Sequence, residues 1–191
     1  MRHDLPDKND PFPLFGNFTP SGTVWRFFMA LAYVLIVDDE VQFVEAMVER
    51  LTIRDFQVAS AFSGPQALAL LEKEPDIEVV VLDLKMPGMD GLEILKAIKI
   101  EHPFVQVIML TGYSTIETVT AAMELGAFDY LLKPYDMEKM VSLINEAAAR
   151  KRNFDEQIRE VRLIPSISER DRREMIDRIE AAAVTCRRIE V

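Results

Sequence analysis

Short apolar runs alternate with longer amphipathic segments along the chain from Tyr33 onward. The runs are rich in β-branched residues, which is typical of strands, and the segments between them repeat apolar residues at helical spacing. The pattern predicts strands at Tyr33–Val37, Gln57–Ser60, Glu78–Leu82, Gln106–Leu110 and Asp129–Leu132. It predicts the intervening helices at Val41–Leu51, Gly64–Lys73, Gly91–Glu101 and Thr115–Leu125.

The two runs VLIV and VVVL contain no polar residue, as strands do when both faces of their sheet are covered. Strands that alternate with helices of about ten residues are joined by right-handed crossovers and pair in parallel. The alternation therefore predicts an α/β fold with a doubly wound, five-stranded parallel sheet.

A long helix is predicted after Tyr135, and Pro165 ends it. Ser168 then caps a last helix. Each helix carries an apolar seam with spacings of three and four residues, formed by Met140, Ile144, Ala147, Lys151, Phe154, Ile158 and Val161 in the first and by Met175, Ile179, Ala182, Cys186 and Ile189 in the second. We expect residues 151–191 to form a C-terminal helical tail, which either serves as a coiled-coil or dimerisation segment or simply extends the domain.

Residues 1–30 show no periodicity and are rich in turn-forming residues, so we expect a flexible leader before a main domain at 31–150. The longest apolar run, Val24–Val37, contains Arg26 and is too short to span a bilayer. Cys186 is the single cysteine, which excludes an intramolecular disulfide and is typical of a reducing cytosol. These features predict a cytoplasmic protein with no membrane partner.

The charge is spread unevenly along the chain. The net charge is −10, but residues 150–191 contain 11 basic and 9 acidic residues, so residues 1–149 carry a net charge of −12. An acidic body repels nucleic acid unless a local basic patch overrides its field. We therefore expect no nucleic-acid partner.

Acidic side chains follow two of the predicted strands. Asp38 and Asp39 come directly after the first strand, and Asp83 follows the third. Ligands of such sheets gather at the carboxyl ends of the strands, so the three acids are expected at one edge. Acids at these positions also cap helices, but three that converge favour a hard cation such as Mg²⁺.

The other strand ends supply a hydroxyl and a cation. Thr111 follows the fourth strand and Lys133 follows the fifth. An anion bound at this edge would meet the Lys133 ammonium, the Thr111 hydroxyl and the metal. A carboxylate in such a cluster can attack phosphorus and form an aspartyl phosphate. The constellation therefore predicts phosphoryl transfer to an aspartate.

The segments VLIVDDE, VVVLDLKMPGMDGLE, VIMLTGYSTIETV and GAFDYLLKP occur in this order and resemble the signature blocks of response-regulator receiver domains. The resemblance covers about residues 32–150, and the last two blocks are most similar to receivers of the NtrC type. It implies a flavodoxin-like sheet with strand order 2-1-3-4-5. Residues 150–191 are too short for an ATPase domain and show neither GxxxxGK[ST] nor a helix-turn-helix pattern. We therefore expect a stand-alone two-component receiver with a helical tail, which acts through a protein partner or as a phosphorelay intermediate.

The resemblance assigns a role to each residue of the site. Asp83 would accept the phosphoryl group, and Lys133, preceding Pro134 in a cis peptide, would hold its oxygens. Thr111 would be the switch hydroxyl, and Tyr130 the aromatic that turns inward when Thr111 moves. The expected Mg²⁺ ligands are Asp38, Asp39, Asp83 and the backbone carbonyl of Lys85.

The implied phosphodonor is a sensor histidine kinase or a phosphotransfer protein. An output protein, which the sequence does not identify, would read the switched surface of the fourth and fifth helices and fifth strand, and a homodimer is a further candidate. We expect no enzyme activity beyond phosphorylation of Asp83 and loss of that phosphoryl group.

Three other functions share part of this sequence pattern. A phosphatase with an aspartyl-phosphate intermediate would carry DxDx[TV] after its first strand, whereas this chain has Asp38-Asp39-Glu40-Val41. A receiver-like interaction module without phosphotransfer would keep the fold and lose the chemistry. A DNA-binding regulator would use Arg170, Arg172, Arg173 and Arg178, but acids alternate with these arginines as on a salt-bridged helix face.

Overall fold

The computed structural model describes residues 32–112 and 115–184. Five parallel strands form one sheet in the order β2-β1-β3-β4-β5, which confirms the predicted topology. The strands are β1 (Tyr33–Val37), β2 (Gln57–Ala61), β3 (Val79–Leu82), β4 (Gln106–Thr111) and β5 (Asp129–Leu132). The leader predicted for residues 1–30 lies outside the described residues.

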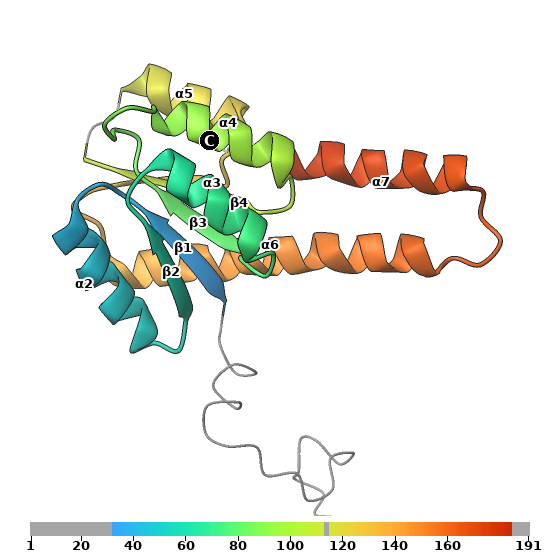
Figure 1. Cartoon of the computed structure of the whole chain (residues 1–191), viewed down its shortest axis with the longest axis horizontal. Coiled ribbons are helices and arrows are strands. Elements are labelled where there is room, and N and C mark those ends of the chain that lie inside the picture. The colour runs from blue at the N-terminus through green and yellow to red at the C-terminus, as the bar shows by residue number, and fades with distance from the viewer. Residues whose placement is uncertain (1–31, 113–114, 185–191) are drawn as a thin grey trace, which may run out of the picture.

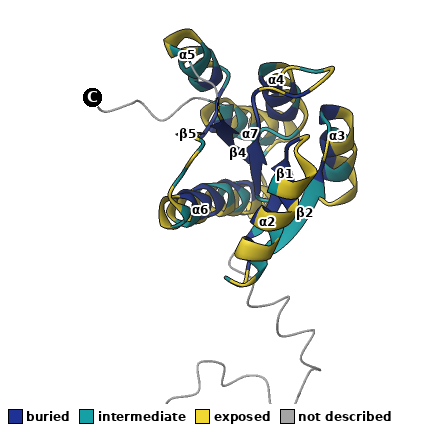
Figure 2. Ribbon diagram, turned by 90° about the vertical axis from the view of Figure 1, so that its left-hand side faces the viewer, coloured by how far each residue is buried: buried dark blue, intermediate teal, exposed yellow. Residues whose placement is uncertain are grey.

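Helices cover both faces of the sheet, so the domain has three layers (Figure 2). One face packs against α2 (Val41–Thr52) and the first half of α6 (Met137–Leu163), and the other against α3 (Gly64–Lys73), α4 (Gly91–Glu101) and α5 (Ile116–Glu124). Each face of the sheet has its own apolar core, centred on residues such as Met47, Leu51 and Ile144 on the α2 side and Leu71, Ile94 and Ile98 on the α4 side. All four residues of the VVVL strand are fully buried, as their uninterrupted apolar pattern predicted.

The long helix α6 continues past the sheet and turns back at Pro165 into α7 (Glu169–Val184), which runs antiparallel beside it (Figure 1). The predicted cap of α7 is present, since the backbone N–H of Asp171 donates to Ser168 Oγ at 3.1 Å. Phe154, Ile158 and Val161 lie in the second half of α6 and are buried. The first half of the predicted seam, Met140, Ile144 and Ala147, therefore packs in the core beneath the sheet, and the second half is buried where α6 lies beside α7.

The rotation of α7 differs from the prediction. Met175 and Ala182 were expected on its apolar face but are exposed to solvent. Ile176 is instead half-buried and Ala183 is buried. Arg172 lies on the same inner face because its guanidinium donates to the carbonyls of Val161 and Arg162, both at 2.8 Å, and of Ile164 at 3.3 Å. These bonds satisfy the free carbonyls at the end of α6 and fix the helix pair in this register. Cys186 and Ile189 lie outside the described residues.

An ion pair and a close backbone approach are among the contacts that join the hairpin of α6 and α7 to the domain. The guanidinium of Arg152 binds both carboxylate oxygens of Glu78, which precedes β3, at 2.5 and 2.9 Å. The end of α7 lies against Gly126, in the turn between α5 and β5 with φ +91°, where an added Cβ would come within 2.5 Å of the Val184 carbonyl oxygen. Only glycine satisfies both the backbone conformation and the close approach at this position. None of the described helices combines the length and apolar character needed to cross a bilayer.

Candidate functional site

The two central strands place buried carboxylates side by side at their carboxyl ends. Val37 pairs with Leu82 in the parallel register, so the next residues, Asp38 and Asp83, are neighbours. The Asp83 N–H continues this pairing by donating to the Val37 carbonyl at 2.9 Å. Asp38 is 2% exposed and Asp83 is 6% exposed. Two acids that are buried this deeply require cationic or hydrogen-bonding partners.

Lys133 supplies one shared cation. It follows β5, precedes Pro134 in a cis peptide as expected, and donates from Nζ to Asp38 Oδ2 at 2.5 Å. The same nitrogen lies 3.6 Å from Glu40 Oε1 and 3.7 Å from Asp83 Oδ1. Burial alone would lower the pKa of Lys133, but the hydrogen bond to Asp38 and the charges of Asp38, Asp83 and Glu40 outweigh it, so the pKa is raised. Lys133 is therefore an ammonium at neutral pH.

Asp83 remains incompletely compensated. Its Oδ2 accepts the Lys85 N–H at 2.8 Å. Burial raises the pKa of Asp83, and the negative charges of Asp38 and Asp39 raise it further, against the opposing effects of the Lys133 charge and the Lys85 N–H. The backbone around Asp83 is packed closely, since a Cβ at Gly91 would lie 2.4 Å from the Asp83 carbonyl oxygen.

The remaining predicted residues lie at the same edge with different exposure. Thr111 ends β4 and is 1% exposed, and Tyr130 is half-buried in β5, paired with Met109. Asp39 and Lys85 are exposed and line a surface hollow together with Met86, Pro87, Gly88, Asp90 and Thr118.

Two further contacts of the Lys133 ammonium were not predicted from the sequence. Glu40 belongs to the acidic triplet that follows β1, so its proximity to the ammonium had a signal in the sequence. Phe43 lies at an apolar position of α2, and its ring also contacts the Lys133 ammonium. Its apolar character and helical spacing gave no indication of a role at the site.

The donor set fits a hard divalent cation. Asp38 and Asp83 direct carboxylate oxygens at the same ammonium, so a positive charge already occupies their common side. The raised pKa of Asp83 shows that this charge does not fully compensate the cluster. Within residues 32–112 and 115–184, no group of three acidic, histidine or cysteine side chains is already arranged as a metal site, so the set of Asp38, Asp39, Asp83 and the Lys85 carbonyl stays a prediction.

Residues 34–145 match the family model of the response regulator receiver domain. The chain belongs to this family. The strand order and the positions of Asp38, Asp83, Thr111 and Lys133 at the strand ends are those expected of a receiver.

Relatives and solved structures agree with this assignment. A putative NtrX-like response regulator from Rickettsia bellii is 40% identical over 121 residues, which cover 62% of this chain and 25% of that protein. The DNA-binding transcriptional regulator NtrC from Klebsiella pneumoniae is 41% identical over 113 residues, which cover 59% of this chain and 24% of that protein. A receiver-domain crystal structure from Clostridium thermocellum matches with a TM-score of 0.61 and 35% identity, covering 63% of this chain and 97% of that one. The chain thus spans about a quarter of these two relatives' length.

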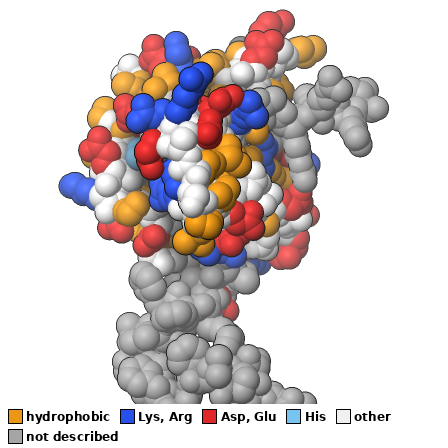
Figure 3. Space-filling model, turned by 90° about the vertical axis from the view of Figure 1, so that its right-hand side faces the viewer, with side chains coloured by type: hydrophobic (Ala, Val, Ile, Leu, Met, Phe, Trp, Pro, Cys, Tyr) orange, Lys and Arg blue, Asp and Glu red, His pale blue; other side chains and the backbone are white. Residues whose placement is uncertain are grey.

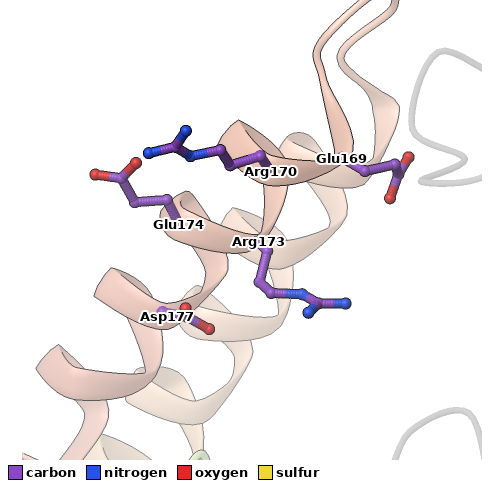
Figure 4. Close-up of a pocket in the computed structure, with 5 residues that line it drawn as sticks. All are labelled: Glu169, Arg170, Arg173, Glu174 and Asp177. Atoms are coloured by element: carbon purple, nitrogen blue, oxygen red, sulfur yellow. The ribbon is translucent and has the colours of Figure 1, made fainter.

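The charged groove on α7 is separate from the receiver site. Glu169, Arg170, Arg173, Glu174 and Asp177 line it, and all five come from one helix, with Arg170 directed toward Glu174 and Arg173 directed away (Figure 4). Of the arginines considered for DNA binding, Arg172 is engaged by the carbonyls at the end of α6 and Arg178 pairs with Glu174 at 2.6 Å. Figure 3, which looks onto the turn of the hairpin, shows basic, acidic and apolar groups interspersed there. Among the described residues visible in this view, acidic side chains therefore lie between the basic ones.

Proposed function

We propose that this chain is a two-component response-regulator receiver that accepts a phosphoryl group on Asp83 and then switches a protein-interaction surface. The observation that carries the proposal is the pairing of Lys133 with two buried carboxylates at the ends of adjacent strands. A buried acid with a raised pKa beside a fixed ammonium provides both a nucleophile and a clamp for the incoming anion.

The phosphodonor is a phosphohistidine of a sensor histidine kinase or a phosphotransfer protein. A carboxylate oxygen of Asp83 attacks phosphorus in line, the P–N bond breaks, and its electron pair leaves with the imidazole, which takes up a proton. Lys133 neutralises the phosphoryl oxygens, and positioning provides most of the acceleration. Mg²⁺, held by Asp38, Asp39, Asp83 and the Lys85 carbonyl, supplies further charge neutralisation when bound.

Thr111 and Tyr130 form the switch in this proposal. The dianion on Asp83 attracts the Thr111 hydroxyl, and Tyr130 occupies the space that Thr111 leaves. Tyr130 borders a second hollow together with Val119, Leu132, Pro134, Tyr135 and Lys139, so its movement would reshape the surface formed by α5, β5 and α6. Phosphorylation shifts the population between two arrangements to the extent that they bind the phosphoryl group differently.

The chain then acts in the cytoplasm through an output protein or a second copy of itself, without nucleic acid or membrane. It turns over no substrate apart from gaining and losing its own phosphoryl group.

Mass spectrometry after incubation with acetyl phosphate and Mg²⁺ tests the proposal, with Asp83→Asn as the matched variant. We expect one phosphoryl adduct on the wild type that is lost in the variant and on omission of Mg²⁺. A folded wild-type protein that gains no adduct would instead identify a receiver-like interaction module without phosphotransfer.

A further inference from the structure

The Lys133 ammonium has an aromatic neighbour in addition to its acidic ones. Its Nζ lies 4.0 Å from the centroid of the Phe43 ring. At this distance the negative face of a ring attracts a cation, most strongly where water is excluded. The Lys133 side chain is 17% exposed, so the contact is partly shielded from water.

The Phe43 ring packs against a second aromatic ring. It meets the Tyr135 ring edge to face, with centroids 6.3 Å apart and planes at 81°. The Tyr135 hydroxyl in turn contacts Met47 Sδ at 3.4 Å. Phe43 and Met47 both lie on α2, and Tyr135 directly follows the cis Lys133–Pro134 peptide. The aromatic pair thus ties α2 to the segment that carries Lys133.

A ring and a carboxylate hold an ammonium in different ways. Asp38 binds Nζ at 2.5 Å through a directional, charged hydrogen bond, whereas Asp83 lies 3.7 Å away. Phosphoryl transfer to Asp83 would place new oxygens beside the same ammonium, which has three N–H donors to share between them and Asp38. An aromatic face carries no net charge, so it attracts the ammonium without neutralising it and without competing as a hydrogen-bond acceptor.

We propose that Phe43 is a positioning residue for Lys133, whose ring face keeps the ammonium over the acidic cluster and available to the phosphoryl group. The inference rests on the proposed function, because its consequence is a faster transfer to Asp83. An aliphatic side chain of similar size would fill the space but leave that side of the ammonium without electrostatic compensation.

A series of fluorinated phenylalanines at position 43 tests the ring face itself. Each added fluorine withdraws electron density from the face with little change in size, so the rate of phosphorylation by acetyl phosphate and Mg²⁺ is expected to fall in steps. Phe43→Leu should slow the reaction about threefold to tenfold, and Phe43→Tyr should restore most of the rate.

The same fluorine series at Phe56 is the matched control. Phe56 is 3% exposed and lies between α2 and β2, where it belongs to the apolar core. Fluorination there should leave the rate unchanged. A flat rate across the series at position 43, or a Phe43→Leu variant as fast as Phe43→Tyr, would overturn the proposal.

A second readout is independent of phosphorylation. In the metal-free protein, the ring current of Phe43 should shift the Lys133 Cε protons upfield, and Phe43→Leu should abolish this shift in the NMR spectrum. If the wild type gains no phosphoryl group, the proposed function fails, and this shift alone decides whether the ring positions the ammonium. Cε protons at their ordinary position in the wild type would refute the contact.

Discussion

The two ends of the molecule use burial for opposite purposes. At the carboxyl ends of the strands, Asp38 and Asp83 are buried beside a single ammonium, and the pKa of Asp83 is raised mainly by burial. Beyond the opposite end of the sheet, the hairpin of α6 and α7 buries Phe154, Ile158 and Val161, and the ring of Phe154 packs against that of Phe104 with centroids 5.8 Å apart. One end concentrates charge out of water, and the other removes apolar surface from it.

The comparison shows that one end of the molecule stabilises the fold and that the other destabilises it. Burial of apolar surface stabilises each time a side chain leaves water. Burial of an incompletely paired carboxylate destabilises, and such groups persist where reactivity requires them. We therefore expect changes at the site to reduce phosphorylation with little loss of stability, and changes in the hairpin to do the reverse.

The largest expected effect concerns the site. Asp38→Asn removes the carboxylate that holds Lys133 and is expected to bind Mg²⁺, so the rate of phosphorylation should fall about 100-fold. Amide hydrogen exchange in α6 and α7 should be unchanged, and the exposed Asp76→Asn should keep the wild-type rate. Faster exchange throughout the hairpin would show that the two ends are not independent.

The converse change is Phe154→Ala. Phe154 is 8% exposed and contacts Phe104 and the guanidinium of Arg150, so its truncation should lower the free energy of unfolding by about 3 kcal/mol. Leu163→Ala on the same helix is the control, because Leu163 is 73% exposed and its loss should cost less than about 0.5 kcal/mol. Urea denaturation measures both variants. Equal losses of unfolding free energy in the two variants would refute the claim that Phe154 lies in a stabilising core. Folded Phe154→Ala should be phosphorylated at the wild-type rate.

A buried cation provides a structural counterpart to Asp83. Lys99 on α4 is 4% exposed and donates to the Val105 carbonyl at 2.7 Å, and burial, with the nearby Arg150 charge, lowers its pKa to about 7. Between that value and 10.5 the folded state binds fewer protons than the unfolded state, so stability rises with pH over this window. Below a pH of about 7, Lys99 is charged in both states, and the full free-energy cost of burying its charge remains.

Lys99→Met should therefore raise the free energy of unfolding by about 2 kcal/mol below neutral pH, and the gain should shrink as the pH rises. Denaturation of both proteins over this pH range measures the difference. Lys96→Met, on the exposed side of the same helix, should show no such dependence. A gain that is constant with pH would mean that Lys99 is not the titrating group.

The fold was largely predictable because its signals are local. The runs VLIV and VVVL marked two strands that are covered on both faces. All nine strands and helices that the pattern placed between Tyr33 and Leu132 begin and end within one residue of the prediction. The rotation of α7 was not predictable, because Arg172 lies on its inner face for a reason outside the helix, namely the free carbonyls at the end of α6. An arginine in a mixed-charge segment gives no sign of such a tertiary partner.

The site was predictable to the level of residues but not of geometry. The order of the strand ends placed Asp38, Asp83, Thr111 and Lys133 at one edge, where the structure has them. That Lys133 lies closer to Asp38 than to Asp83 depends on side-chain conformations, which a linear pattern does not encode. The expected binding of Mg²⁺ by Asp38, Asp39 and Asp83 stays a prediction, and among these residues Asp39 is exposed whereas Asp38 and Asp83 are buried.

The smallest expected effect is that of Asp83 on the free energy of unfolding. The folded-state pKa of Asp83 is raised above its ordinary value of 3.8, so between the two values the folded protein binds more protons than the unfolded chain. Stability therefore falls as the pH rises through this window, and the full free-energy cost is present above the folded-state pKa. Asp83→Asn removes the charge and keeps the shape, so in the absence of metal it should raise the free energy of unfolding by about 1 kcal/mol near neutrality.

Denaturant titrations with a chelator should show this gain vanish as the pH approaches 3.8, while the exposed Asp177→Asn on α7 shows no gain at either pH. A less stable Asp83→Asn protein at neutral pH would mean that Lys133 more than compensates Asp83, and that the contrast between a costly site and a stabilising hairpin does not hold.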